Sequence, residues 1–117
     1  MDRWPVEYAD DFLEEVEGYP EKVQDRIAAL AQVLEEMGPH LGRPKVDTLK
    51  GSKHSNMKEL RFELARGVWR VAFAFDPKRR AILLVAGNKQ GVDEAKFYRD
   101  LIKTADARFD SHLARLK

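Results

Sequence analysis

The chain has 117 residues, with 21 Lys and Arg against 20 Asp and Glu, three His and no Cys. This length predicts one small domain spanning residues 1–117, and an apolar content of 44% is enough to fill one core. The lack of cysteine excludes a disulfide framework, a thiol nucleophile and a thiolate metal site. No apolar run approaches ~18 residues and no basic-then-apolar leader opens the chain. We therefore expect neither a membrane span nor export, and a cytoplasmic location.

The net charge of +1 hides a division between two parts of the chain. Residues 1–42 carry three basic and eleven acidic side chains, whereas residues 43–117 carry eighteen basic and nine acidic ones. Such asymmetry predicts a polyanion-binding surface made by one part of the fold, with the acidic part kept away from it. Two solvated faces of opposite sign would give the same composition.

The first half of the chain is expected to be mainly helical. Residues 3–8 alternate between apolar and polar side chains and predict a short edge strand. Asp10 and Asp11 are candidate N-caps of a brief helix that ends at Gly18. A longer helix is expected over residues 20–37. Its apolar positions recur at spacings of four and three: Val23, Ile27, Leu30, Leu34 and Met37.

The second half changes to a period of two, which predicts strands over residues 57–64, 68–75 and 81–87 and a weaker one over 46–49. Short links rich in turn residues favour an antiparallel meander. A last helix is expected from Asp93 to Leu116. The sequence thus predicts an α+β fold, in which an N-terminal strand and helices pack on an antiparallel sheet and a C-terminal helix follows.

A register argument places two arginines on one face of the first hairpin. If the large Phe62 and Trp69 share the core face, paired residue numbers sum to an odd value. That pairing sets Arg61 beside Arg70, either directly or diagonally. Directly opposed side chains have Cβ atoms roughly 4.5–5.5 Å apart, and like charges so placed are destabilising unless a negative group lies between them. A phosphate is such a group, because arginine binds it through two parallel hydrogen bonds.

The alternative is that Glu59 and Glu63, on the same face, neutralise the arginines as a surface network. The surroundings favour an external anion, since residues 43–90 hold twelve basic and four acidic side chains. A basic loop leads into the first strand of the hairpin, and a plain solvated loop is its other interpretation. Its predicted contacts with an RNA backbone are Lys50, Lys53, His54 and Lys58.

The other candidate catalytic or ligand-binding residues do not form a recognisable motif with one another. His54 is a candidate general acid or base, or an incidental loop histidine. His40 and His112 are expected to be structural or solvent-facing, and the three histidines lack the spacing of a zinc site. Lys89 follows no phosphate-binding loop motif, which argues against a nucleoside triphosphatase. Tyr98 is expected at the margin of the core, where its hydroxyl would face outward or its ring would stack on a base.

Several segments together resemble the RelE/HigB superfamily of type II toxin–antitoxin toxins, and specifically its phage-derived HigB-like branch. The matching segments are Glu59-Leu60-Arg61-Phe62, Trp69-Arg70-Val71, Phe73 to Pro77, Leu84-Val85-Ala86-Gly87-Asn88-Lys89, Lys96-Phe97-Tyr98 and Ala105-Asp106-Ala107-Arg108. The resemblance implies a RelE-like fold and ribosome-dependent mRNA cleavage without a metal or other cofactor. In that reaction the RNA 2′-hydroxyl attacks the adjacent phosphate.

The same resemblance implies roles for individual residues. Arg70 matches the strand arginine that holds the scissile phosphate, and Arg61 lies where a basic strand residue contacts it. Lys89 matches the basic residue after the last strand, and Tyr98 matches an aromatic residue near the site. RelE-like enzymes carry a second lysine in the first strand of the hairpin, and Glu59 lies near that place here. The C-terminal histidine arrangement of some HigB toxins is not reproduced either. The general base is therefore open among four residues: Lys58, His54, Glu59 and Tyr98.

The implied partners are mRNA on the ribosome and a cognate antitoxin, expected to be a small helix-turn-helix DNA-binding protein. Two alternatives use the same scaffold. One is a ParE-like inhibitor that cleaves no RNA, against which the paired Arg61 and Arg70 argue, because phosphate chemistry needs them and protein blocking does not. The other is an inactive, RNA-binding prophage remnant.

Overall fold

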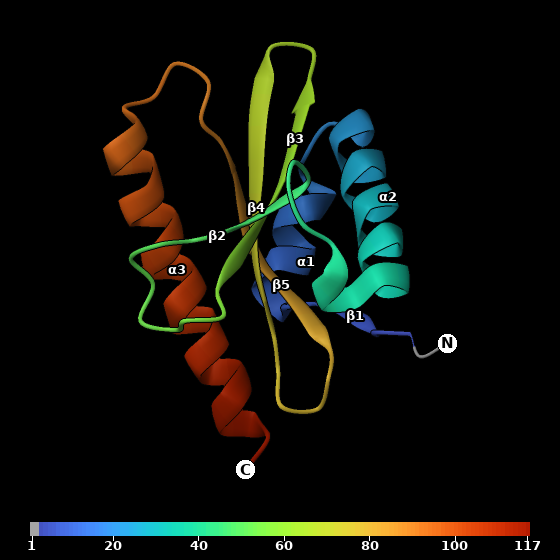
Figure 1. Ribbon diagram of the computed structural model, residues 1–117. Helices are drawn as coiled ribbons and strands as arrows, with labels where there is room; N and C mark the ends of the chain where they lie inside the picture. The colour runs from blue at the N-terminus through green and yellow to red at the C-terminus, as the bar shows by residue number, and fades with distance from the viewer. Residues whose placement is uncertain (1–2) are drawn as a thin grey trace.

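The computed structural model describes residues 3–117 and has three layers (Figure 1). Helices α1 and α2 lie on one side of a five-stranded sheet, and helix α3 lies on the other. Among residues 3–117, no helix is both long and apolar enough to cross a bilayer. The elements in chain order are β1 (Val6–Tyr8), α1 (Asp10–Glu17), α2 (Glu21–Met37), the 3-10 turn η1 (Gly38–His40), β2 (Val46–Thr48), β3 (Lys58–Leu64), β4 (Gly67–Phe75), β5 (Ala81–Asn88) and α3 (Glu94–Arg115).

The strand order in the sheet is β1-β5-β4-β3-β2. Strands β2 to β5 pair antiparallel with their neighbours in the sequence, so the predicted meander is confirmed. Strand β1 extends the sheet at its other edge by pairing parallel to β5, with Val6 opposite Ala81. The α+β class predicted from the sequence is confirmed.

Alternation along the strands supplies a separate core to each face of the sheet. Leu60, Val71 and Phe73 pack with α1 and α2 on one face. Ala72 and Ala74 point to the other face, where they pack against α3. Since one face of β3 and β4 is committed to the α1–α2 core, the polar residues between those positions must face α3.

The ends of α2 and α3 lie within one residue of the prediction, since Pro20 precedes α2 and Leu116 follows α3. Asp93 caps α3 as predicted, because its carboxylate accepts a hydrogen bond from the Lys96 backbone at 2.9 Å. The expected capping by Asp10 or Asp11 is wrong: Ala9 precedes the helix, and both aspartates lie in its first turn. Carboxylates in the first turn still interact favourably with the positive end of the helix dipole.

Candidate functional site

Arg61 of β3 and Arg70 of β4 are direct partners in the sheet, as the register argument predicted. Its premise is also correct, because Phe62 pairs with Trp69 and their rings stack with centroids 6.1 Å apart. Both arginines face α3. The Arg70 side chain is 6% exposed and that of Arg61 is 29% exposed, so an external group reaches Arg61 first.

Glu59 lies beside both guanidinium groups. One carboxylate oxygen is 3.7 Å from Arg70 Nε, and the other is 4.0 Å from Arg61 Nε. Asp47 of the neighbouring strand approaches Arg61 at 3.8 Å. These distances mark charge pairs without hydrogen bonds. The expected neutralisation by Glu59 and Glu63 is therefore half right: Glu59 lies beside both arginines, whereas Glu63 is exposed near the end of β3.

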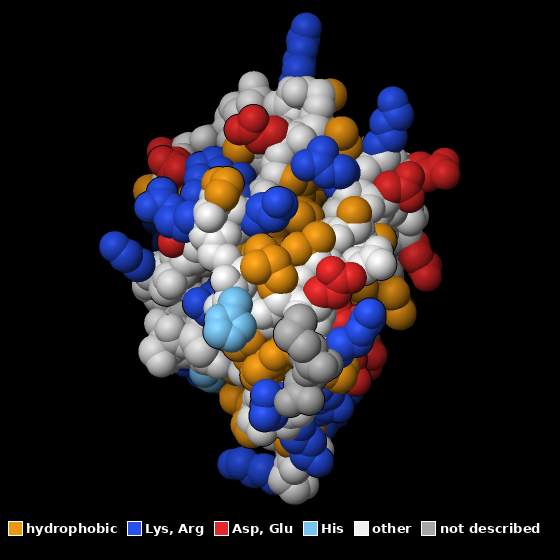
Figure 2. Space-filling model, turned by 45° about the vertical axis from the view of Figure 1, so that its right-hand side comes forward, with side chains coloured by type: hydrophobic (Ala, Val, Ile, Leu, Met, Phe, Trp, Pro, Cys, Tyr) orange, Lys and Arg blue, Asp and Glu red, His pale blue; other side chains and the backbone are white. Residues whose placement is uncertain are grey.

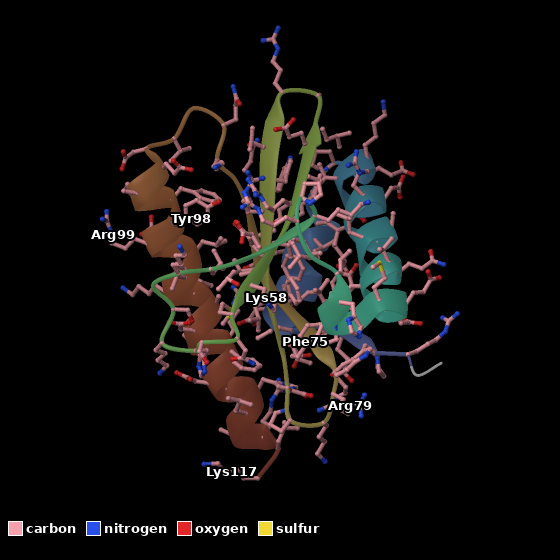
Figure 3. All side chains as sticks on the ribbon, in the orientation of Figure 1. Lys58, Phe75, Arg79, Tyr98, Arg99 and Lys117 are labelled. Atoms are coloured by element: carbon pink, nitrogen blue, oxygen red, sulfur yellow. The ribbon has the colours of Figure 1, made fainter. Side chains whose placement is uncertain are left out.

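The start of α3 covers Arg70 with an aromatic side chain. The Arg70 Nε donates to the Tyr98 hydroxyl at 3.2 Å, and its Nη1 donates to the Trp69 carbonyl at 2.9 Å. Figure 3 shows Tyr98 turned toward the sheet and the next residue, Arg99, turned away from it. The Lys89 Nζ lies 5.3 Å from the centre of the Tyr98 ring. Residues from β3, β4, the end of β5 and α3 thus meet at one place.

Two carboxylates of this region respond differently to their surroundings. Burial raises the pKa of Glu59 above its ordinary value, and the lowering influence of Tyr98, Arg70 and Arg61 offsets this only in part. The exposed Glu94 accepts a hydrogen bond from the Lys89 Nζ at 2.7 Å, and this contact lowers its pKa. The buried carboxylate is therefore the one that binds a proton more readily than usual.

Two residues of the basic loop that were predicted to contact RNA, His54 and Lys53, instead contact α3 at a distance from the arginine pair. His54 Nε2 lies 2.8 Å from the Asp110 carboxylate, and Lys53 forms an ion pair with the same aspartate. Asp110 follows Tyr98 by twelve residues on α3, which is about 18 Å along a helix. Lys50 is exposed in the same loop. The loop histidine and lysine therefore pin their loop to α3 rather than join the arginine pair.

Lys58 is separated from the arginines by the sheet itself. It pairs with Phe73 of β4, and the alternation puts it on the same side as Leu60 rather than with Glu59 and Arg61. The alternation of side chains along β3 could have predicted this orientation of Lys58 from the sequence. The structure thus brings together Arg61, Arg70, Lys89 and Tyr98, and it keeps Lys58 and His54 apart from them.

The chain matches the family model described as phage-derived protein Gp49-like over residues 14–110. The chain belongs to this family. Two relatives from Mycobacterium tuberculosis are named as toxins, HigB2 and HigB3. Identity to HigB2 is 48% over 101 residues, which cover 86% of this chain and 50% of that protein. Identity to HigB3 is 44% over 88 residues, which cover 75% of each chain. The chain thus spans half the length of HigB2.

Solved structures of RelE proteins are similar to this Gp49-like chain. A free mutant of Escherichia coli RelE aligns with a TM-score of 0.59 and 12% identity, over 86% of this chain and 95% of RelE. A chain of a Pyrococcus horikoshii RelE–RelB complex aligns with a TM-score of 0.55 and 17% identity, over 77% of this chain and 99% of that one. At these identities the likeness establishes a shared fold.

A second charged cluster of the Gp49-like chain was not expected from the sequence. Asp76, in the β4–β5 turn, is fully buried and accepts hydrogen bonds from the Arg80 side chain at 3.0 Å and two backbone amides. His112 of α3 lies 2.8 Å from the same carboxylate. Of the two roles expected for His112, structural or solvent-facing, the structure shows the first. Its partner Asp76 lies 36 residues away in the sequence.

The basic residues of 43–90 do not form one surface, contrary to the expectation from their number. Lys78, Arg79 and Arg80 lie in the turn after β4, about 20 Å along the strand from Arg70. On the face drawn in Figure 2, Lys and Arg side chains also gather at the lower end, where this turn and the end of α3 lie. The nine-residue strand β4 separates the basic turn from the arginine pair, because it runs from one end of the sheet to the other.

The arrangement around Arg61 and Arg70 suits an anion more than a cation. Arg61 and Arg70 lie side by side, the Arg70 guanidinium contacts the Tyr98 hydroxyl, and arginine pairs match the geometry of a phosphodiester. Within residues 3–117, no group of three or more His, Asp or Glu side chains is arranged to hold a metal ion. The side chains present can bind a phosphate, orient a hydroxyl and exchange a proton.

Proposed function

We propose that this chain is the toxin of a type II toxin–antitoxin system, and that it cleaves mRNA on the ribosome by attack of an RNA 2′-hydroxyl on the adjacent phosphate. The observation that carries the proposal is the direct pairing of Arg61 with Arg70 beneath Tyr98. Glu59 lies beside these like charges at 3.7–4.0 Å without hydrogen-bonding to them, so a phosphate that does so would be the better counter-ion. The similarity to HigB2 and HigB3 supports the assignment as a toxin.

The proposed reaction needs three contributions from the protein, and none of them requires a metal or another cofactor. The phosphate must be held so that the 2′-hydroxyl attacks in line, which is the role proposed for Arg70. Negative charge that builds up on the phosphate must be stabilised, which Arg61 and Lys89 would do. A proton must leave the attacking oxygen and another must reach the departing one.

The contacts narrow the choice of groups that exchange these protons. Glu59 and Tyr98 both contact Arg70, whereas His54 is bound to Asp110 and Lys58 faces the α1–α2 core. A group that transfers a proton must lie within hydrogen-bond reach of the reacting atom, directly or through one water. The proposal therefore assigns proton exchange to Glu59 or Tyr98, and it gives Lys50, Lys53 and Lys58 at most a part in non-specific RNA affinity.

The proposed partners are mRNA in the ribosome and a helix-turn-helix antitoxin made in the same cytoplasm. One solved RelE neighbour was crystallised with RelB, which supports the expectation that a small protein neutralises this chain. Basic groups at both ends of the sheet would favour an RNA-rich surface such as the ribosome.

The test is to induce the chain in a bacterial host without its neighbouring gene and to map mRNA 5′ ends. Cuts in register with codons are expected from the wild type. Arg70→Ala should reduce them by about 10²–10³-fold, the usual effect of removing a group that stabilises the transition state. Arg99→Ala is the matched control, since Arg99 is exposed and next to Tyr98 but turned away. Arrest with intact mRNA and damaged DNA would favour a ParE-like inhibitor, and harmless expression an inactive remnant.

A further inference from the structure

Glu59 carries a buried side-chain oxygen that the rest of residues 3–117 leave without a hydrogen bond. Its side chain is 7% exposed, and its Oε1 has no hydrogen-bond partner. Buried polar atoms in native proteins are nearly always hydrogen-bonded, so an unpaired carboxylate oxygen needs a reason. Glu59 lies where it serves both Arg61 and Arg70 yet hydrogen-bonds to neither.

We propose that Glu59 is the counter-ion that a phosphate displaces from Arg61 and Arg70, and that it takes up a proton from solvent when the phosphate binds. In the free protein, the carboxylate reduces repulsion between the paired guanidinium groups. In the complex, the phosphate oxygens take over that role with proper hydrogen bonds. Glu59 then becomes a neutral carboxylic acid, which has an O–H to donate.

The charges around Glu59 explain why phosphate and proton should bind together. Asp47 from β2 disfavours the carboxylate, whereas Arg61 from β3, Arg70 from β4 and Tyr98 from α3 favour it. Burial already raises the pKa of Glu59 in the free protein. A phosphate would add negative charge beside Glu59 and occupy the arginines that now favour its ionised form. Both changes raise the pKa further, so protons are taken up on binding and affinity is greatest at low pH.

Sulfate is a suitable probe, because it has the shape of a phosphate and does not titrate between pH 5 and pH 8. The carboxyl carbon signals of Glu59 and Glu63 are followed by NMR against pH, with sulfate and with chloride at equal ionic strength. Sulfate should raise the pKa of Glu59 and move the signal of Glu63, which is exposed on the same face, no more than chloride does. An unchanged Glu59, or equal movement of both glutamates, would overturn the inference.

Affinity measurements on variants give an independent readout. Wild-type affinity for sulfate should fall with rising pH once the pH passes the raised pKa of Glu59 in the free protein, by up to about tenfold per pH unit. Glu59→Gln should bind sulfate with little pH dependence and more tightly than the wild type at pH 8. Glu63→Gln is the matched control and should keep the wild-type profile. An equal pH dependence in all three proteins would contradict the inference.

The inference rests on the proposed function only in taking a phosphate as the natural ligand. Sulfate binding that is coupled to Glu59, without mRNA cleavage in cells, would leave the anion site standing and remove the nuclease assignment. Cleavage that depends on Arg70, without any coupling between sulfate and Glu59, would remove only the inference about Glu59.

Discussion

Two buried carboxylates of this chain, Asp76 and Glu59, are surrounded by opposite charge in different ways. Asp76 accepts several hydrogen bonds of 2.8–3.0 Å from Arg80, His112 and the backbone of its turn. Glu59 has cationic neighbours only at 3.7–4.0 Å, and one of its oxygens has no partner. Hydrogen bonds lower the pKa of Asp76 despite its burial, whereas burial prevails at Glu59 and raises its pKa.

The difference separates a structural site from one that is ready to bind. Both oxygens of Asp76 accept hydrogen bonds, so this carboxylate would gain nothing from a further ligand. It holds the β4–β5 turn against α3. A carboxylate with an unpaired oxygen beside two arginines stabilises the fold less, and its arginines are available to a better acceptor. Neutralisation should therefore destabilise the fold strongly at Asp76 and little at Glu59.

The largest effect on stability is expected for Asp76→Asn. The amide keeps the size of the side chain but removes the charge and turns an NH₂ group toward donors of Arg80 and His112. Breaking a buried ion pair from one side costs about 3 kcal/mol or more. Denaturation by urea should show this loss in the free energy of unfolding. A loss no larger than that of an exposed control would mean that the Asp76 cluster is not structural.

The matched control and the pH dependence sharpen this prediction. Asp100→Asn removes an exposed i,i+4 ion pair with Lys96 and should leave stability unchanged within error. Because the pKa of Asp76 is lowered in the folded state, its contribution is present above the ordinary value of 3.8 and is lost as the pH falls through the lowered one. The difference between wild type and Asp76→Asn should therefore shrink as the pH falls below 4.

A smaller effect is expected for Gly87→Ala, which changes no charge. A Cβ on Gly87 would lie 2.7 Å from the Phe97 ring, so that ring must shift and carry Tyr98 with it. Overpacking of this kind costs about 1–2 kcal/mol when a side chain can yield. Urea denaturation and 5′-end mapping should show a modest loss of stability together with reduced cleavage. Gly42→Ala, with open space around its Cβ, should change neither.

The arginine pair could be predicted from the sequence because strand register is a local property. Two large aromatic residues fix which face of the hairpin is buried, and the period of two then decides where Arg61 and Arg70 point. The same rule separates Lys58 from Glu59, although its position beside the basic loop suggested a shared RNA contact. Where the alternation of a strand decides which way a side chain points, the sequence was sufficient to predict that orientation.

Contacts made by loops could not be predicted in this way. The loop that carries Lys53 and His54 has no period, and its partner Asp110 lies more than fifty residues away. The pairing of Asp76 with His112 likewise depends on how α3 crosses the sheet. The burial of Glu59 has the same origin, because it follows from the packing of α3 over β3 and β4. Tertiary packing decided which charges were satisfied, and hence which cluster is structural.

The smallest effect on stability, and the sharpest contrast with Asp76, is expected for Glu59→Gln. The glutamine resembles the neutral form of Glu59, which burial already favours, and the hydrogen bonds of Arg70 to Tyr98 and Trp69 remain. Stability should stay within about 1 kcal/mol of wild type. A raised pKa means that the wild type loses stability as the pH rises from 4.5 through the folded-state value. Urea denaturation of both proteins from pH 4 to 8 should therefore show the variant gaining on the wild type as the pH rises. A constant loss of several kcal/mol would make Glu59 a structural carboxylate like Asp76, and the distinction between the two clusters would fail.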